Sequence, residues 1–260
     1  MEFFKLSIVK TNTDKPIASN FPMHIHDEYE IYYFLSGNCA YSVEGNVYQL
    51  SSGDIVIINK NEAHHPIIQK SSSYTRMFIT FTPHFETNDL LHEDFMSIFA
   101  NKPNGLNNHF SSKRFPDNNW HFFFNSIYES DDNTQKQVFL MALLLELKAC
   151  ASAAKEVNTC YTSDRIHQVT QYIDRHLTQS LSLEMLSQHF FVSPSQLNRN
   201  FRKNLGITVG EYISTKRLLL AHELICQGKK PKSVYKNCGF CDYSAFYRAY
   251  KKKFGHSPRG

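Results

Sequence analysis

The amino-acid sequence predicts an α+β protein of two domains: an N-terminal β-rich domain with appended helices, followed by an all-α domain. Strand-like segments separated by Gly, Asn and Asp turns fill residues 1 to about 85, whereas from Trp120 onward apolar residues recur with a helical period. Residues 1–160 carry 12 basic and 18 acidic side chains, a net charge of −6, and residues 161–260 carry 16 and 6, a net charge of +10. This asymmetry in a chain of 260 residues favours two domains, the second suited to binding a polyanion.

Composition excludes several protein classes. Hydrophobic residues make up 42% of the chain and aromatic residues 14%, which is enough to build folded cores. The longest fully apolar run, Val138–Leu145, has eight residues, far below the roughly 20 that span a bilayer, so we expect no membrane segment. The N-terminus does not resemble a secretory signal, and six irregularly spaced cysteines do not form a disulfide framework. These features predict a cytoplasmic protein with free thiols.

The predicted strands of the first domain are short and closely spaced. Five segments rich in β-branched and aromatic residues end at turn residues or polar positions: Glu30–Leu35, Ala40–Val43, Val47–Leu50, Ile55–Ile58 and Arg76–Phe81. Such spacing is typical of an all-β sandwich or barrel.

A helix is predicted over Gln137–Ala154, and its apolar face is wider than a surface helix needs. This face either packs on the β-rich domain or forms a subunit interface, and the sequence leaves both open. Beyond it, Lys155–Asp164 loses its periodicity and becomes polar. We therefore expect domains at 1–154 and 163–260, joined by a linker at 155–162.

The basic segment contains a repeat with a constant offset of 49 residues, which aligns Ser193–Gly206 with Asp242–Gly255. In each copy three apolar side chains recur at i, i+4 and i+8, on one face of a helix. They are Leu197, Phe201 and Leu205 in the first copy and Phe246, Tyr250 and Phe254 in the second. Each copy begins at an N-cap residue and ends at a glycine suited to a left-handed C-cap.

Each repeated helix follows a shorter helical segment across a tight connection, as in a helix-turn-helix motif. The two motifs are expected at about 182–205 and 232–254. The exposed faces of the second helices carry side chains that donate hydrogen bonds to bases and phosphates. They are Ser195, Gln196, Asn198, Arg199 and Arg202 in the first, and Tyr243, Ser244, Tyr247, Arg248, Lys251 and Lys252 in the second. One polar helix face is usually only solvated, but two in register within a basic segment favour DNA binding.

One long amphipathic helix is predicted between the motifs, over Val209–Gln227. Its 19 residues, at 1.5 Å rise each, make about 28 Å, and successive major-groove faces on one side of B-DNA lie about 34 Å apart. One protomer is therefore expected to place its two recognition helices in consecutive major-groove segments.

Short motifs recur across the basic segment, among them Val192–Arg202, Gly206–Thr208, Lys216–Leu218, Cys238–Phe240 and Phe254–Pro258. Together they resemble the AraC/XylS-type DNA-binding domain over about Ser163–Gly260. The resemblance implies base contacts from Ser195, Asn198 and Arg199 in the first motif and from Ser244, Tyr247 and Arg248 in the second. The chain departs from the family pattern at Ser187 and Tyr235, where a small alanine is usual, and at Pro231, where an aliphatic residue is usual.

The segment from His24 to Gly37 spells H-x-H-x3-E-x6-G, which resembles the first cupin motif. The segment from Gly53 to His65 resembles the matching later strand and turn of AraC-type cupins. This resemblance implies a cupin-like β-barrel that serves as an effector pocket, and the expected effector-binding residues are His24, His26, Glu30 and His64.

Cupin enzymes bind a transition metal through two His and the Glu of the first motif together with a further His. In this chain the usual position of that further His is Val56, so the set is incomplete, and His64 or His65 would have to substitute from the end of the strand. No nucleotide-binding loop or nucleophile motif is present in the sequence. We therefore expect no catalytic residue, no metal and no cofactor.

These patterns predict a sequence-specific transcriptional regulator that binds double-stranded DNA and a small-molecule effector. The helices around Trp120–Ala154 are expected to pair two protomers in a homodimer, and RNA polymerase is a candidate further partner. Two alternatives remain open. A metal-dependent cupin enzyme with an accessory DNA-binding domain would hold stoichiometric Fe, Mn or Ni. A ligand-independent regulator, controlled by its own abundance or by a protein partner, would show no thermal shift with any metabolite.

Overall fold

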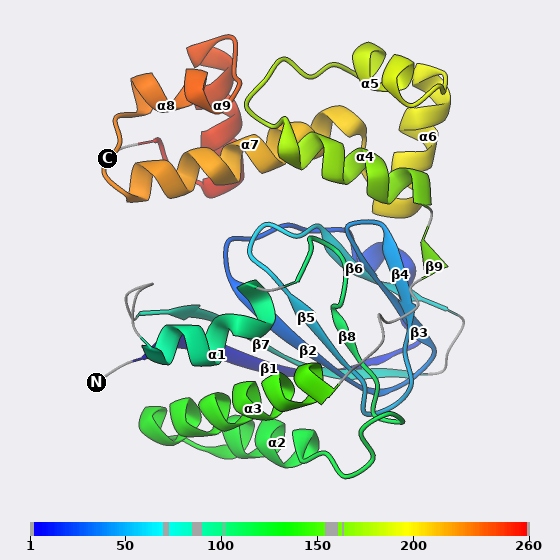
Figure 1. Cartoon of the computed structure of the whole chain (residues 1–260), viewed down its shortest axis with the longest axis vertical. Coiled ribbons are helices and arrows are strands. Elements are labelled where there is room, and N and C mark those ends of the chain that lie inside the picture. The colour runs from blue at the N-terminus through cyan, green and yellow to red at the C-terminus, as the bar shows by residue number, and fades with distance from the viewer. Residues whose placement is uncertain are drawn as a thin grey trace. The chain divides into compact units, whose positions relative to one another are not determined.

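The computed structural model describes residues 3–69, 73–84, 90–100, 102–153, 161–162 and 164–258. The chain forms two compact units, one made of residues 1–24 and 28–161 and the other of residues 162–260 together with 25–27 (Figure 1). The predicted class, α+β in two domains, is confirmed. Most of the predicted linker, residues 155–160, lies outside the described residues, so its exact limits stay a prediction.

The first unit contains two sheets, one with the strand order β1-β7-β2-β5-β8 and the other with the order β6-β3-β4-β9. The strand pairs β1–β7, β7–β2, β2–β5 and β3–β4 are antiparallel, as are β3–β6 and β5–β8. The strands are β1 (Phe4–Asp14), β2 (Tyr29–Ser36), β3 (Cys39–Val43), β4 (Asn46–Gln49), β5 (Ile55–Ile58), β6 (His64–Ile68), β7 (Ser73–Pro83), β8 (His109–Phe110) and β9 (Tyr161–Thr162). A short 3-10 helix covers Ala18–Asn20. All five segments predicted as strands are strands.

Strands β2 and β5 lie inside the larger sheet and are buried on both faces. Successive side chains of a strand point to opposite faces, so Ile31 and Tyr33 pack toward the helices, whereas Tyr32 and Phe34 pack toward the smaller sheet. This double burial explains why β2 reads in the sequence as a continuous apolar run rather than as an alternating one.

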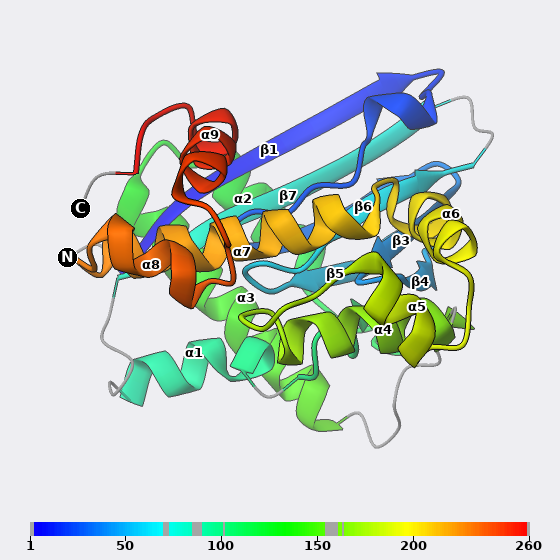
Figure 2. The same ribbon diagram turned by 90° about the horizontal axis from the view of Figure 1, so that it is seen from above.

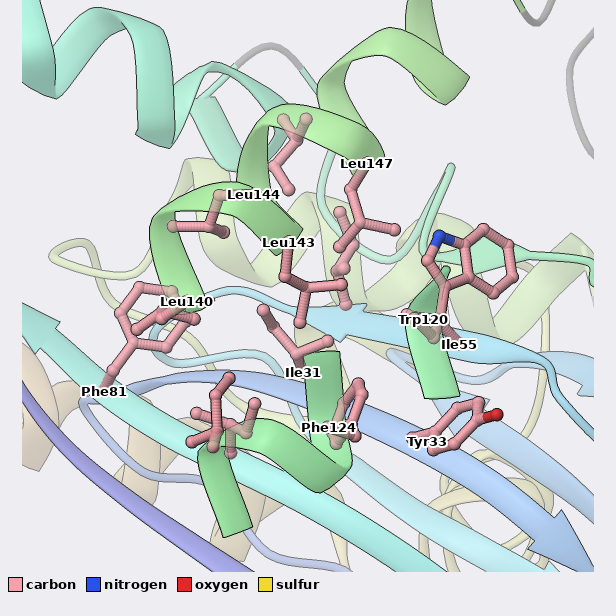
Figure 3. Packing of buried hydrophobic residues seen from close by; sticks show 14 of the residues in the cluster. Ile31, Tyr33, Ile55, Phe81, Trp120, Phe124, Leu140, Leu143, Leu144 and Leu147 are labelled. Atoms are coloured by element: carbon pink, nitrogen blue, oxygen red, sulfur yellow. The ribbon is translucent and has the colours of Figure 1, made fainter. Parts of the chain in front are cut away.

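Helices α1 (Leu90–Ala100), α2 (Trp120–Glu129) and α3 (Asn133–Ala153) cover the outer face of the larger sheet. Figure 3 shows the leucines of α3 pointing toward Ile31, Phe81 and Phe124. These leucines are fully buried: Leu140, Leu143, Leu144 and Leu147. Two roles were left open for the wide apolar face of this helix, packing on the β-rich domain and forming a subunit interface. The four leucines pack on the β-rich domain.

The second unit is helical, with α4 (Asp164–Arg175), α5 (Leu183–His189), α6 (Pro194–Leu205), α7 (Val209–Cys226), α8 (Pro231–Asn237) and α9 (Tyr243–Phe254). Figure 2 shows α7 running between two helix pairs, with α5 and α6 near one end and α8 and α9 near the other. These pairs are the two predicted helix-turn-helix motifs, and α7 is the predicted long helix. Within the described part of the chain, every helix is too short or too polar to cross a bilayer.

Candidate DNA interface and β-barrel site

Helices α6 and α9 begin and end on the predicted capping residues. The Ser193 side chain accepts a hydrogen bond from the Gln196 backbone N–H, and the Asp242 carboxylate accepts one from the Ala245 backbone N–H at 2.6 Å. Both helices end at a glycine in the left-handed conformation, Gly206 with φ 73° and Gly255 with φ 78°. The N-cap side chains accept from backbone N–H groups that the helix start leaves unpaired, and the left-handed glycines end the helices. These residues therefore determine where each recognition helix begins and ends.

The apolar face of each recognition helix packs inward, so its polar face is presented to solvent. Leu197, Phe201 and Leu205 of α6 are fully buried, and Phe246 and Tyr250 of α9 pack against α7 and α8. Eight of the predicted DNA-binding residues are exposed: Ser195, Arg199, Arg202, Ser244, Tyr247, Arg248, Lys251 and Lys252. The two exposed lysines of the second set, Lys251 and Lys252, lie in the last turn of α9, where they also complement the helix dipole.

The other three predicted DNA-binding residues are partly buried and make contacts within the unit. Gln196 Nε2 donates to Asn200 Oδ1 at 2.8 Å, and its amide oxygen accepts from Arg199. The Tyr243 ring packs on Tyr235 with ring centroids 5.4 Å apart.

Asn198 connects the first recognition helix to α7. Its Oδ1 accepts a hydrogen bond of 3.0 Å from the backbone N–H of Val209, the first residue of α7. Thr208 and Glu211 form a capping box around the same helix start, which lowers the pKa of Glu211 by hydrogen bonding to its carboxylate. Asn198 therefore helps to hold α6 at the beginning of α7. A base that accepts both an N–H and a lone pair from this amide would compete with the Val209 N–H for its oxygen.

The turns of the two motifs differ in the residue that takes the left-handed conformation. In the first motif it is Phe191, with φ 53° and a side chain that is 94% exposed. In the second it is Gly239, with φ 83°, and a Cβ built there would lie 2.8 Å from the Arg217 guanidinium. That guanidinium is held by Leu177 and Gln179, whose backbone carbonyls accept from it at 2.9 and 2.6 Å. The sequence places Phe191 in the connection of the first motif but does not indicate its left-handed conformation, for which the absence of a glycine from this turn was the available signal.

The departures from the family pattern are accommodated locally. Ser187 is buried and its hydroxyl donates to the Glu184 carbonyl at 2.8 Å. Pro231 occupies the first position of α8, where its missing N–H leaves no bond unmade. Tyr235 stays half-buried, with its ring 6.3 Å from that of Phe246 in the core of the second motif.

In the β-barrel, three of the four predicted effector-binding residues meet in one cluster, whereas the fourth, His26, belongs to the other compact unit. His24, Glu30 and His64 each offer an imidazole nitrogen or carboxylate oxygen, and these three atoms all lie within 4.8 Å of one another. Glu30 and His64 are buried and His24 is exposed, so the cluster reaches from the barrel interior to solvent.

The backbone fixes the two ends of this cluster. His24 and His64 form an antiparallel bridge in which each backbone N–H donates to the other's carbonyl at 3.1 Å, and their rings lie 4.2 Å apart. Glu30 lies on β2, where its Oε2 is 3.6 Å from His64 Nε2 and its Oε1 accepts from the Tyr41 hydroxyl at 3.4 Å. The sequence left His64 and His65 open as a substitute for the missing cupin histidine but placed His64 among the effector-binding residues, and the structure brings His64 into the cluster.

The two adjacent histidines differ in their electrostatic surroundings. Burial acts to lower the pKa of His64, but the Glu30 carboxylate raises it by hydrogen bonding and charge, and the pKa lies above its ordinary value. Burial lowers the pKa of His65 to about 4, assisted by the nearby His64. The position of the missing cupin histidine, Val56, is fully buried in the core between the sheets.

A buried ionic network supports the start of β6. The Glu62 carboxylate accepts from Lys102 Nζ at 2.6 Å, from the Gly105 backbone N–H at 2.7 Å and from Asn108 Nδ2 at 2.9 Å. Burial acts to raise the pKa of Glu62, but Lys102 and these hydrogen bonds bring it below its ordinary value. The network holds the carboxylate ionised, and the Glu62 carbonyl accepts from His64 Nδ1 at 2.7 Å.

A second polar group in the barrel was not foreseen from the sequence. The Arg76 guanidinium lies over the rings of Phe21, Tyr74 and Phe78, with its Cζ 5.1 to 5.4 Å from their centroids. Its Nη1 donates to the Tyr74 hydroxyl at 3.2 Å, and that hydroxyl shares a 2.6 Å hydrogen bond with Tyr32. The register between β2 and β7 brings these groups together. The apolar and polar alternation of the sequence does not give this register, so the sequence does not indicate which tyrosines lie beside Arg76.

Two family models match the chain. The model described as an AraC-like ligand binding domain matches residues 14–91, and the model described as a helix-turn-helix domain matches residues 186–260. The first match contains the histidine cluster, and the second contains both recognition helices.

Some curated relatives match most of the chain, and others match about a third of it. The arabinose operon regulatory protein of Escherichia coli is 26% identical over 83% of this chain and 73% of its own length. The transcriptional activator RhaS of Escherichia fergusonii is 22% identical over 92% of this chain and 86% of its own length. The probable transcriptional regulator LumQ of Photobacterium leiognathi is 38% identical over 35% of this chain, which spans only 37% of that relative.

Proposed function

Because this chain belongs to the AraC family of transcriptional regulators, we propose that α6 and α9 enter consecutive major-groove segments of one DNA duplex and that a ligand in the β-barrel controls this binding. The chain is an AraC-type regulator with a helix-turn-helix DNA-binding domain and an N-terminal ligand-binding domain. What is proposed concerns which residues contact DNA, what controls the binding and how the protomers assemble.

The observation that carries the proposal is the pair of matching exposed faces on α6 and α9. Each has an arginine at the same position of the repeat, Arg199 and Arg248, and both are exposed. Arginine can bind the O6 and N7 atoms of guanine in a bidentate manner in the major groove. The 18 residues of α7 make about 27 Å, a length comparable with the 34 Å between successive major-groove faces.

The remaining exposed groups divide by their chemistry. Ser195, Ser244 and Tyr247 carry hydroxyls that read base edges at short range, and Arg202, Lys251 and Lys252 are placed to neutralise phosphates. We assign the base-reading role to the first group together with the two arginines, and the affinity-giving role to the second.

We assign control of DNA binding to the β-barrel cluster of His24, His26, Glu30 and His64. Three of these side chains, those of His24, Glu30 and His64, come together from β2, β6 and the segment before β2, and that of His24 reaches solvent. A ligand there shifts a regulator only if it binds one conformation better than another. We propose that the barrel acts in sensing rather than in catalysis and that the protein works in the cytoplasm, where bacterial DNA is found.

We propose that α2 and α3 pair two protomers. Their outward side carries exposed apolar residues, namely Phe122 at 57%, Val138 at 52% and Leu145 at 46%. Large apolar groups gathered at one surface mark an interface more often than a solvated face. In sedimentation equilibrium, Leu145→Glu should shift the protein toward monomer, whereas Lys113→Glu at an exposed site elsewhere should not. RNA polymerase is a candidate further partner.

The DNA-binding role is tested by sequencing the genomic fragments that the purified full chain retains. Arg199→Ala should weaken binding to these fragments by about 1 to 3 kcal/mol and relax the preference at one base pair. Lys252→Ala should weaken binding to all sequences alike and reduce the salt slope by about 0.9. An equal loss for every sequence with Arg199→Ala would refute its base-reading role.

A further inference from the structure

A cavity of about 280 Å³ lies in the helical unit, between the two helix-turn-helix motifs. One of its walls is a single face of α7, on which Val209, Ile213 and Arg217 recur at intervals of four residues. The other walls come from residues 181–183, at the start of α5, and from Phe240, in the turn of the second motif. A molecule in this cavity would therefore contact both motifs and the helix that joins them.

The lining of the cavity combines a mostly apolar surface with one cation. Its charged side chain is that of Arg217, and its apolar side chains are those of Leu181, Leu183, Val209, Ile213 and Phe240. Small-molecule sites are typically concave and mostly apolar, with a few polar groups, and have volumes of roughly 300–1,000 Å³. This cavity has the same chemistry and lies near the lower end of that range, so it suits a small ligand.

The Arg217 guanidinium is only partly satisfied by the protein. Its Nε donates to the Leu177 carbonyl at 2.9 Å and its Nη2 to the Gln179 carbonyl at 2.6 Å. Among the residues that the structure describes, no acceptor is bonded to Nη1 and no carboxylate lies within 4 Å of the group. Burial lowers the pKa of Arg217, as expected for a cation that is taken out of water without a counter-ion.

The surroundings of this guanidinium favour an anionic ligand. Residues 161–260 carry a net charge of +10, and arginine binds carboxylates through strong, charge-assisted hydrogen bonds. The group is also held in place, because two carbonyls accept from it and the Gly239 backbone packs so closely that an added Cβ would lie 2.8 Å away. A carboxylate that accepts from Nη1 would therefore meet a positioned donor and supply the missing counter-ion.

Gly210 leaves space open at the lining. It lies in the first turn of α7, and a Cβ added there would meet no heavy atom within 4 Å. Ser214, one turn further along the same face, also lines the cavity and is half-buried. Larger side chains at these two positions would therefore take up free space without displacing core residues.

We propose that this cavity is a second ligand site, which binds a small carboxylate with an apolar body, and that the bound molecule holds the two motifs in one relative arrangement. Arg217 binds the carboxylate, and the apolar side chains bury the rest of the molecule. The inference goes beyond the proposed function, which places ligand control in the β-barrel, and only its effect on DNA binding rests on that function.

The binding test titrates the full chain with hexanoate, a short linear carboxylate, and follows binding by saturation-transfer NMR. Hexanamide has nearly the same shape without the charge, and acetate has the charge without the apolar chain. Each of these two should bind at least about tenfold more weakly than hexanoate, because each lacks one of the two interactions.

Variants of the lining locate the site. Gly210→Leu and Ser214→Leu should each weaken hexanoate binding by about tenfold or more, because the added side chains occupy the space of the ligand. The matched control is Gly210→Ala, whose single methyl group should leave binding within about threefold. Arg217→Gln should reduce the preference for hexanoate over hexanamide to less than about twofold, a ratio that a general loss of stability does not change.

Retention of genomic DNA fragments by the same preparation, with and without hexanoate, tests the coupling to DNA. A change in fragment affinity of about threefold or more that Gly210→Leu abolishes supports both the site and its coupling. Equal binding of hexanoate and hexanamide, or hexanoate binding that both leucine variants leave unchanged, overturns the site. Binding at the site with no effect on fragment affinity overturns the coupling alone. If no fragments are retained sequence-specifically with or without hexanoate, the regulatory function is overturned, whereas the site is judged by the hexanoate titrations alone.

Discussion

The two helix-turn-helix motifs share a sequence frame but are stabilised differently. In the first motif, Asn198 ties the recognition helix to the start of α7 through the Val209 backbone N–H. The equivalent position of the second motif, 49 residues later, is Tyr247, which is 37% exposed. The second recognition helix is instead held by aromatic packing, including Tyr243 against Tyr235. Equivalent positions of a repeat therefore need not have equivalent roles. Asn198 makes a hydrogen bond that connects two helices, whereas the side chain of Tyr247 at the equivalent position is exposed.

The turns show the same asymmetry. Gly239 has a left-handed backbone beside the Arg217 guanidinium, whereas Phe191 takes the left-handed conformation with its side chain in solvent. Left-handed backbone is costly for residues other than glycine. The first turn is therefore strained but spacious, and the second is relaxed but crowded, so substitutions at the two turns should have opposite signs.

The largest stability effect is expected from Gly239→Ala. The added Cβ would meet a guanidinium that is fixed by the Leu177 and Gln179 carbonyls, and the residue would also adopt an unfavourable φ. Together these should lower the free energy of unfolding by about 2 kcal/mol. Urea denaturation followed by circular dichroism measures it, and a loss below about 0.5 kcal/mol would show that the second turn is not crowded.

A smaller loss is expected from Asn198→Ala. Removing the acceptor of the Val209 N–H should lower the free energy of unfolding by about 1 kcal/mol, the usual effect of losing a helix N-terminal partner. Tyr247→Ala, at the equivalent position of the second motif, should leave stability within about 0.5 kcal/mol and weaken DNA binding instead. If Asn198→Ala kept full stability but lost discrimination at one base pair, the framework role of Asn198 would be wrong and its predicted base contact correct.

The smallest effect, and a favourable one, is expected from Phe191→Gly. Relief of the left-handed strain should exceed the greater flexibility of glycine in the unfolded chain, for a net gain of about 0.5 kcal/mol. Because the ring is 94% exposed, little buried contact is lost. Thermal unfolding at matched concentration checks this, and a clear decrease in the melting temperature would mean that the ring packs on a neighbour.

The recognition helices could be predicted from the sequence because their signals are local. The caps at Ser193 and Asp242 and the terminal glycines lie within one turn of the helix ends that they determine. The 49-residue offset makes the same signals recur in both copies. The roles of individual exposed residues were less predictable. The bond between Asn198 and Val209 joins two helices, and no periodicity within α6 indicates it.

The β-barrel site required strand register, which the sequence does not specify. Adjacent residues of a strand point to opposite faces, so a choice between His64 and His65 amounts to fixing the register of β6 by one residue. The bridge between His24 and His64 fixes it. The residues predicted to line the site were identified from their motif, but the meeting of His24, Glu30 and His64 around one point depends on strand pairing between segments that lie up to 40 residues apart.

The central claim, that α6 and α9 read two adjacent groove segments of one duplex, is tested most directly by selecting binding sites from a random DNA library. Wild type should select two blocks of preferred bases with centres about 10 base pairs apart. Arg199→Ala should lose preference within one block and Arg248→Ala within the other, while the second block of each stays intact. A single block, or loss of the same bases in both variants, would contradict the account.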